Sequence, residues 1–244
     1  MFRKIVQPFY TAYVVITFLV SILIATPFFA LLSIGATKSG REGIYKIVKY
    51  WSGVWFWCMG MPVHILGRRP REGRYVVVIN HISYLDTLLI FPSMPSYFRP
   101  LGKKEISKVP ILGFVYRQIV VMVDRSSTHS RALSMRLMWR TLKRESDIVI
   151  FPEGTFNETG AVLKEFYNGA FRLAIAAQTP ILPVLFPDTV HRWHYSAWWK
   201  LWPGKNRVVF LPPVPVEGLT LTDVAMLKQK VYDIMAVELA KYPR

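Results

Sequence analysis

A histidine and an aspartate five positions apart, His81 and Asp86, follow a continuous apolar run at residues 76–79. The run is rich in β-branched residues, which predicts a buried strand. On a regular helix this spacing would point the two side chains roughly 140° apart, so they meet only where the chain bends from strand to helix. Asp86 would then accept the Nδ1 proton of His81, and the free Nε2 would act as a general base toward a hydroxyl. The alternative is a capping aspartate beside a purely structural histidine.

Two further apolar runs, residues 119–123 and 148–151, also end on polar clusters, which are Asp124 with Arg125 and Glu153 with Gly154 and Thr155. Between them, residues 127–144 begin with N-capping side chains and end on basic ones, as a helix does. Helical connections make strands parallel, and the carboxyl ends of parallel strands meet at one edge of a sheet, where α/β proteins bind ligands. The sequence therefore predicts an α/β fold with a mixed, mostly parallel sheet flanked by helices.

The polar clusters at that edge suit the transfer of an acyl group to an alcohol. Arg125, helped by Lys103 or Lys104, would bind an anionic group of the substrate. Glu153 would orient the substrate or Arg125. Two backbone amides would supply further hydrogen-bond donors, those of Gly154 and Thr155. The chain has no Gly-x-Ser-x-Gly sequence and no cysteine near these clusters, which argues against a covalent acyl-enzyme.

The composition combines strong positive charge with high hydrophobicity. The 244 residues carry a formal net charge of +16, the isoelectric point is about 10.1 and the mean hydropathy is +0.27. A nucleic-acid-binding protein is usually basic but less apolar. An anionic membrane surface and anionic substrates therefore account better for both properties.

We expect no metal site. The single cysteine, Cys58, excludes an internal disulfide and a cysteine-based zinc site of ordinary spacing. Asp188, His191 and His194 have a spacing that could place them on one side of a helix. Pro187 and the aromatic residues nearby instead favour a surface loop without a metal.

The N-terminal part of the chain is predicted to lie in a membrane, because residues 5–37 contain no charged side chain and about 20 apolar residues suffice to cross a bilayer. No typical signal-peptidase site follows, so we expect the segment to be retained. It could form one tilted spanning helix, or a hairpin of two half-helices that breaks at Pro27; basic residues on both sides favour the hairpin. We expect a membrane-embedded helical segment at residues 1–60 and a catalytic domain at residues 61–244, on the cytoplasmic side of the cytoplasmic membrane.

Three other segments carry local predictions. Residues 63–66 and 75–79 are predicted to form a β-hairpin with a basic loop. The tryptophans within residues 51–57 suit the headgroup level of a bilayer and a core helix equally well. Residues 192–202 hold four tryptophans and a tyrosine among cations, which favours docking at a membrane surface over burial in a soluble core.

Four short motifs resemble, in order and spacing, those of the phospholipid/glycerol acyltransferase family, in particular the 1-acylglycerol-3-phosphate O-acyltransferases. They are His81-Ile82-Ser83-Tyr84-Leu85-Asp86, Val123-Asp124-Arg125, Phe151-Pro152-Glu153-Gly154-Thr155 and Ile181-Leu182-Pro183-Val184. A His-x4-Asp pair alone is a weak signal. Phe-Pro-Glu-Gly-Thr is a strong one, and the four motifs in this order are very specific.

The resemblance implies a membrane-bound enzyme that moves a fatty acyl group to the free hydroxyl of 1-acyl-sn-glycerol-3-phosphate, which gives phosphatidic acid. The donor would be an acyl thioester on coenzyme A or acyl carrier protein, a co-substrate, with no cofactor and no nucleic acid involved. His81 and Asp86 would be the catalytic dyad. The substrate-binding residues would be Arg125, Glu153, Gly154, Thr155, Lys104 and Asp124.

The chain departs from the family where many members carry a basic residue or serine after Gly-Thr and a lysine before Gly-Ala-Phe. These positions hold Phe156-Asn157 and Tyr167-Asn168 here, although Lys164 and Arg172 could compensate. Fewer phosphate-binding cations leave other acceptors open, such as a lyso-ornithine or lyso-glycine aminolipid, or a lysophospholipid in remodelling. The non-enzymatic alternative is a basic module that binds membrane lipids or nucleic acid.

Overall fold

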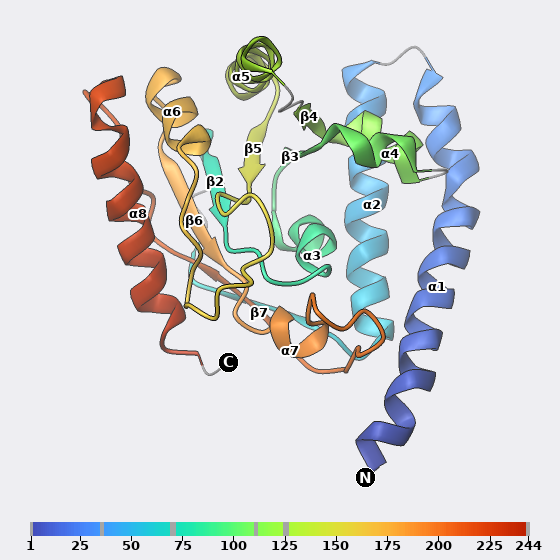
Figure 1. Cartoon of the computed structure of the whole chain (residues 1–244). Coiled ribbons are helices and arrows are strands. Elements are labelled where there is room, and N and C mark those ends of the chain that lie inside the picture. Colours follow the sequence, from blue (N-terminus) through green and yellow to red (C-terminus); the bar gives the residue numbers. More distant parts are fainter. Residues whose placement is uncertain (1, 35–36, 69–71, 110–111, 124–126, 243–244) are drawn as a thin grey trace.

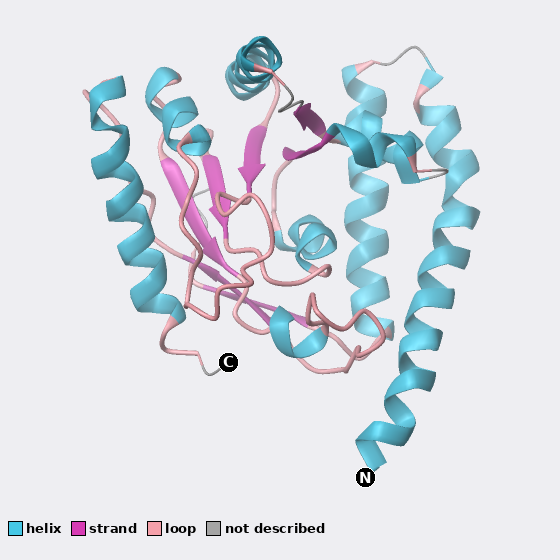
Figure 2. Ribbon diagram, in the orientation of Figure 1, coloured by secondary structure: helices cyan, strands magenta, loops and turns pink. Residues whose placement is uncertain are grey.

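The computed structural model describes residues 2–34, 37–68, 72–109, 112–123 and 127–242. A seven-stranded sheet lies between two layers of helices, and the two long N-terminal helices pack along one side (Figures 1 and 2). The strands are β1 (Val63–Leu66), β2 (Val76–Ile79), β3 (Phe98–Lys103), β4 (Val121–Val123), β5 (Asp147–Ile150), β6 (Ile181–Leu185) and β7 (Asn206–Phe210). The helices are α1 (Phe2–Leu32), α2 (Lys38–Cys58), α3 (Asp86–Ser93), α4 (Leu112–Ile119), α5 (Thr128–Arg144), α6 (Gly169–Ala176), α7 (Thr189–Arg192) and α8 (Val224–Leu239), with short 3-10 helices η2 (Lys104–Lys108) and η3 (Leu221–Asp223).

The sheet has the order β1-β7-β6-β2-β5-β3-β4, and every pairing except β6 with β7 is parallel. This confirms the predicted mixed, mostly parallel sheet flanked by helices. β2 lies at its centre, between β5 and β6, and all four of its side chains are fully buried. Val77 and Ile79 contribute to the core under α1–α4, whereas Val76 and Val78 contribute to the core under α5, α6 and α8. A continuous apolar run is what a strand covered on both faces requires.

The predicted hairpin of residues 63–66 and 75–79 is wrong. β1 pairs in parallel with β7, through Val63 and Asn206, while β2 pairs with β5 and β6. Close packing at the end of β1 accounts for this. Gly67 has a φ of 77° and lies so near β7 that a Cβ atom would come within 2.3 Å of the Phe210 carbonyl oxygen. The chain is thereby held at the β7 edge, away from the central position that the apolar β2 occupies.

α1 is continuous from Phe2 to Leu32, so the predicted break at Pro27 does not occur. Pro27 cannot donate a backbone hydrogen bond, but it is exposed on the surface of the helix. The hydroxyl of Thr26 donates to the Ile22 carbonyl at 2.8 Å, an additional bond in the same turn. The reversal of chain direction instead lies between α1 and α2 (Figure 1).

α1 packs against the rest of the protein along one face and exposes the other. Its Val14 and Phe29 are buried, and the Thr11 hydroxyl donates to the Trp199 carbonyl at 2.8 Å. Large apolar side chains on the opposite face are exposed at helical spacing, namely Ile5, Phe9, Tyr13, Ile16, Val20, Ile24, Phe28 and Leu31. Within the described part of the chain, α1 is the one helix long and apolar enough to cross a membrane. An exposed apolar face of this length associates the protein with a membrane.

α2 divides the tryptophans whose environment the sequence left open. Trp55 is 6% exposed and belongs to the core shared with β2, while Trp57 on the other side is 73% exposed. The helix begins with the side chain of Thr37, which accepts the backbone N–H of Gly40. α2 therefore packs into the core that the sheet also uses. The proposed division between a membrane segment at residues 1–60 and a catalytic domain at residues 61–244 stays a prediction.

Most of the remaining elements match the sequence patterns. The helix predicted at 127–144 is α5, capped by Ser127, whose side chain accepts the Ser130 N–H at 3.0 Å. Two differences stand out. The apolar run at 119–123 forms a strand only from Val121, because α4 continues to Ile119. The strand β3 was not predicted, because Arg99 and Pro100 interrupt its apolar pattern.

Candidate active site

His81 and Asp86 are brought together by the turn from β2 to α3. The His81 Nδ1 and Asp86 Oδ2 atoms are 2.9 Å apart. A carboxylate can only accept, so Nδ1 carries the proton and Nε2 is left as the free base of the ring. The carboxylate of Asp86 is fully buried, whereas the His81 side chain is 13% exposed. The histidine side chain is therefore partly exposed, while the residue that orients it is not.

The backbone of the turn fixes the aspartate. The N–H groups of Ile82 and Ser83 both donate to Asp86 Oδ2 at 2.8 Å, so three donors converge on one oxygen. Asp86 is also the first residue of α3, where the helix dipole favours a negative charge. Its other oxygen, Oδ1, is buried and has no hydrogen-bond partner among the described residues. This confirms the strand-to-helix bend that the spacing predicted.

The Phe-Pro-Glu-Gly-Thr turn after β5 holds His81 from the other side. The His81 N–H donates to Glu153 Oε1 at 2.7 Å, and the His81 carbonyl accepts the Asn157 N–H at 2.9 Å. The imidazole stacks on the ring of Phe151, with centroids 4.1 Å apart, and contacts Phe156 at 4.5 Å. Backbone and ring are therefore both restrained, which leaves the histidine one orientation.

Glu153 has a structural role that the sequence did not suggest. Its side chain is fully buried, and its two oxygens accept the backbone N–H groups of His81, at 2.7 Å, and of Lys164, at 2.9 Å. Buried charge-assisted bonds of this kind hold segments in place. The glutamate thus braces the dyad loop against the loop that precedes α6. Its expected contact with Arg125 lies outside the described residues.

The amides of Gly154 and Thr155 differ in their availability. Gly154 has a φ of 73°, and its N–H donates to the Phe151 carbonyl at 3.0 Å. This amide therefore closes the turn after β5, and its expected hydrogen bond to a substrate stays a prediction. The Thr155 N–H has no hydrogen-bond acceptor among the described residues, and the Thr155 hydroxyl accepts the Lys164 ammonium at 2.7 Å. Lys164 thus reaches the motif, as the sequence suggested.

The cationic side of the site is described only in part. Lys104 begins η2 directly after β3, and β3 is parallel to β5, so Lys104 follows a strand end at the same edge of the sheet as Glu153. Asp124 and Arg125 follow β4, which pairs in parallel with β3 through Lys103 and Val123. These two residues themselves lie outside the described residues.

Two polar residues that the sequence reasoning did not use anchor the dyad loop. Asn80 is buried and exchanges two hydrogen bonds with the backbone of Phe186, at 2.8 and 3.2 Å. Ser83 is fully buried, and its hydroxyl donates to the Trp193 carbonyl at 2.6 Å. The available signal was the presence of two small polar residues directly beside a buried strand end. Such groups need partners, which here lie more than 100 residues away.

No group of three His, Cys, Asp or Glu side chains within the described ranges is arranged to hold a metal ion. The Asp188-His191-His194 segment is not an open loop, since α7 forms one helical turn there and Asp188 is buried. Asp188 accepts the Arg207 backbone N–H and side chain, at 2.7 and 2.8 Å. The aspartate is therefore used in an ion pair.

Comparison with known proteins identifies the family. The family model described as Acyltransferase matches residues 61–186, which is just over half of the chain and contains the dyad, the turn after β5 and β6. The chain belongs to the acyltransferase family. This acyltransferase is 34% identical over 176 residues to the human protein named 1-acyl-sn-glycerol-3-phosphate acyltransferase alpha, covering 70% of this chain and 62% of that protein. It is 27% identical over 184 residues to the 1-acyl-sn-glycerol-3-phosphate acyltransferase of Limnanthes alba, covering 75% and 65%.

The matched part of this acyltransferase thus spans about three-fifths of the length of the human relative. Its fold is similar to that of a solved structure, the 1-acyl-sn-glycerophosphate acyltransferase PlsC from Thermotoga maritima, with a TM-score of 0.82 and 23% sequence identity. The superposition covers 98% of this chain and 97% of the other. The likeness therefore includes α1 and α2 as well as the sheet.

Proposed function

We propose that this acyltransferase transfers a fatty acyl group from an acyl thioester to the hydroxyl of 1-acyl-sn-glycerol-3-phosphate, which yields phosphatidic acid. The observation that carries the proposal is the 2.9 Å contact between His81 Nδ1 and Asp86 Oδ2, on a histidine whose side chain is 13% exposed and which follows the carboxyl end of β2. The names of the human and Limnanthes relatives support this acceptor.

In the proposed reaction, His81 Nε2 removes the proton of the acceptor hydroxyl as its oxygen attacks the thioester carbonyl. The new C–O bond forms, the C–S bond breaks and the leaving thiolate takes up the proton held by the imidazolium. Asp86 stabilises the imidazolium and fixes its orientation, and its hydrogen bond to Nδ1 is kept throughout the reaction. The Thr155 N–H, which has no acceptor among the described residues, is suited to donate to the oxyanion.

Binding of the acceptor is assigned to the cations at the ends of β3 and β4. Arg125 would bind the phosphate as a two-pronged donor, with Lys104 nearby and Asp124 helping to orient the arginine. Coenzyme A and acyl carrier protein both remain possible carriers of the acyl group, and neither requires a further cofactor.

We propose that the protein lies on one membrane surface with α1 along the bilayer. The exposed apolar stripe of α1 extends from Ile5 to Leu31, while Val14 and Phe29 on its other face are buried against the rest of the protein. A helix that packs on a folded domain by one face and exposes a long apolar stripe on the other is suited to lie in the plane of the membrane interface. Because coenzyme A and acyl carrier protein are soluble, the sheet edge would face the cytoplasm.

The test is an acylation assay with purified protein and a panel of acceptors. Lysophosphatidate, a lyso-aminolipid and a lysophosphatidylcholine are each offered with acyl-coenzyme A and with acyl carrier protein as donor. Phosphatidic acid formation at least tenfold above the other products supports the proposal. Preferential acylation of a lyso-aminolipid would instead support the alternative acceptor, and no acylation at all would leave a lipid-binding role.

Arg125→Lys distinguishes acceptor binding from donor binding. A lysine keeps the charge but loses the paired donors of the guanidinium, so the KM for lysophosphatidate should rise about tenfold while the KM for the donor changes less than twofold. A rise confined to the donor KM would move Arg125 to the carrier's phosphates.

A further inference from the structure

A pocket that is not lined by His81 or Asp86 lies between the first turns of α1 and α7 with the segment that follows it. It has a volume of about 950 Å³ and is lined by twelve residues. Six of these are basic or histidine, namely Arg3, Lys4, His191, Arg192, His194 and Lys200. None of the described residues that line it carries a carboxylate. Four cationic side chains, Arg3, Lys4, Arg192 and Lys200, around one space with no carboxylate in its described lining suit the binding of an anion.

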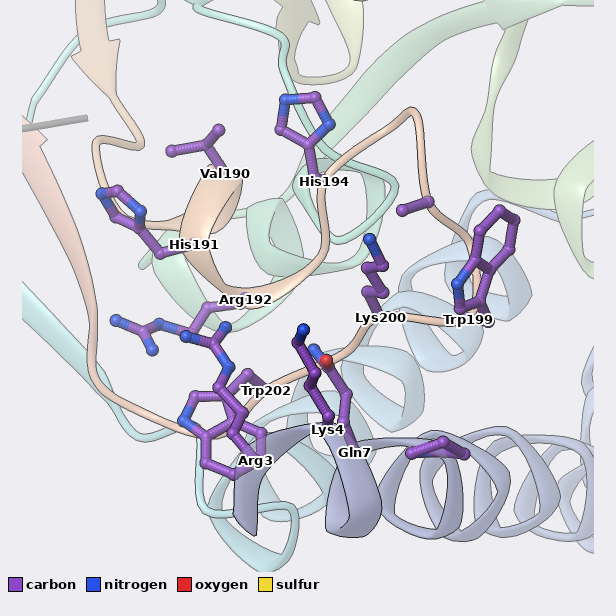
Figure 3. A pocket seen from close by; sticks show the side chains of 12 residues that line it. Arg3, Lys4, Gln7, Val190, His191, Arg192, His194, Trp199, Lys200 and Trp202 are labelled. Carbon is purple, nitrogen blue, oxygen red and sulfur yellow. The ribbon is translucent and has the colours of Figure 1, made fainter. Parts of the chain in front are cut away.

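The ammonium groups of Lys4 and Lys200 are available to a ligand. Both side chains are exposed, and neither forms an ion pair with a described residue. Figure 3 shows the side chains of Lys4, Gln7 and Lys200 extending into the same space above α1, with His194 beyond them. A phosphate between them would be bound from two elements that are far apart in the sequence.

The other cations of the pocket crowd one another. The Arg3 guanidinium lies over the ring of Trp202, 4.9 Å from its centroid. The Nη1 of Arg192 donates to the Pro203 carbonyl at 2.7 Å, and its buried Nε has no hydrogen-bond partner among the described residues. Burial lowers the pKa of Arg192. The negative charge of Asp188 raises this pKa, and the positive charge of Arg3 lowers it further. An anion in the pocket would relieve this repulsion.

The walls of the pocket are fixed before any ligand binds. The Thr11 hydroxyl donates to the Trp199 carbonyl and accepts the Leu201 N–H at 3.1 Å, and Gln7 donates to the Leu201 carbonyl at 3.3 Å. Trp193 Nε1 donates to the Trp198 carbonyl at 2.9 Å. A preformed site of this kind spends little binding energy on ordering its own side chains.

The position of the pocket indicates where the anion comes from. The exposed apolar stripe of α1 begins at Ile5, directly after the two basic residues that line the pocket. Trp199 on the other wall is 48% exposed, and its neighbour Trp198, which does not line the pocket, is 64% exposed. Basic side chains and exposed indoles at the end of an apolar face mark the level of lipid headgroups. The pocket therefore opens where the phosphates of a bilayer lie.

We infer that this pocket binds the phosphate headgroup of an anionic glycerophospholipid of the surrounding bilayer, at a site separate from the dyad. Lys4 and Lys200 would bind the phosphate, and Trp199 would lie against the glycerol backbone or the upper acyl chain. The site does not depend on acyl transfer, so it is expected unchanged in His81→Ala.

The experiment titrates the full chain, in non-ionic detergent, with dioctanoyl phosphatidylglycerol and dioctanoyl phosphatidylcholine, using tryptophan fluorescence. The anionic lipid should bind at least tenfold more tightly to the wild type. Lys4→Gln with Lys200→Gln should weaken its binding about thirtyfold, because each lysine near a phosphate contributes about a fivefold factor in affinity. The matched control is Lys143→Gln with Lys230→Gln, which removes the same charge from two exposed sites on α5 and α8 and should change nothing.

Binding of phosphatidylglycerol by the Lys4/Lys200 variant within twofold of the wild type would overturn the inference, as would equal binding of the two lipids by the wild type. The steady-state KM values for acyl-coenzyme A and lysophosphatidate provide a separate readout and should change less than twofold. If one of them rises while phosphatidylglycerol binding stays intact, the pocket belongs to the donor or the acceptor. Repeating the titration in His81→Ala separates failure of this inference from failure of the proposed function.

Discussion

The carboxylate of Glu153 accepts the backbone N–H of His81 at 2.7 Å, across 72 residues of sequence. Its second oxygen accepts the Lys164 N–H at 2.9 Å, and the side chain is fully buried. The glutamate of the turn after β5 therefore positions the histidine of the turn after β2. Two of the four sequence motifs are therefore parts of one hydrogen-bonded unit.

Glu153→Gln should damage both stability and catalysis. A glutamine amide can accept only one of the two N–H groups and turns its own NH2 toward the other, which leaves a buried donor unsatisfied. We expect a loss of about 1–3 kcal/mol in the free energy of unfolding. The kcat should fall at least tenfold with a smaller change in the KM values, because His81 is displaced rather than the substrate. Urea unfolding measures the free energy of unfolding, and steady-state kinetics measure kcat and KM. Glu158→Gln, at an exposed position, is the control.

The ion pair between Asp188 and Arg207 makes stability depend on pH. Burial by itself would raise the pKa of Asp188, but the hydrogen bonds and charge of Arg207 outweigh it, so the pKa lies below its usual value of 3.8. A lowered carboxyl pKa stabilises the folded state above pH 3.8 and loses this effect as the pH falls through the native value.

Asp188→Asn should therefore lower the free energy of unfolding by about 1–3 kcal/mol at pH 7, and the difference from the wild type should shrink below about pH 4. Urea unfolding in detergent at pH 7, 5 and 3 measures the change. Asp233→Asn, an exposed aspartate on α8, is the control and should show little effect at any pH. A difference that stays constant from pH 7 to pH 3 would show that the ion pair is not its source.

The exposed tryptophans after α7 should contact lipid. Trp198 and Trp199 are 64% and 48% exposed, which excludes the core alternative for these two indoles. In vesicles of brominated phospholipid, Trp198→Ala with Trp199→Ala should lower the fraction of fluorescence that the bromine quenches. Trp139→Ala, which removes a 41% exposed tryptophan of α5, should leave that fraction unchanged or higher. If Trp139→Ala lowered the quenched fraction and the Trp198/Trp199 variant did not, the membrane-facing surface would lie on α5.

The sequence predicted the dyad geometry because its causes are local. An apolar β-branched strand, a turn and a helix beginning at Asp86 suffice to bring that side chain to His81. The parallel arrangement of β2, β4 and β5 was predictable for a similar reason, since helical segments connect the strands. These features follow from residues near one another in the chain.

The features that the sequence missed depend on distant partners. β1 joins β7 rather than β2, because Gly67 fits against the Phe210 backbone, and periodicity within residues 63–79 cannot reveal this. The roles of Glu153 and Ser83 were hidden because the donor to Glu153, the His81 N–H, lies 72 residues away and the acceptor from Ser83, the Trp193 carbonyl, lies 110 residues away. The sequence left open one continuous helix or a hairpin broken at Pro27, and α1 continues through Pro27, which is exposed.

The central claim is that His81 is the general base of acyl transfer, and the most direct test is the turnover number of purified His81→Ala with lysophosphatidate and an acyl thioester. Losing the base should lower kcat on the order of a hundredfold to ten-thousandfold, with thermal unfolding and membrane association unchanged. Asp86→Asn should cost less, because the imidazole remains, and His129→Ala on the exposed surface of α5 should behave as the wild type. Turnover of His81→Ala within a few fold of the wild type would contradict the account.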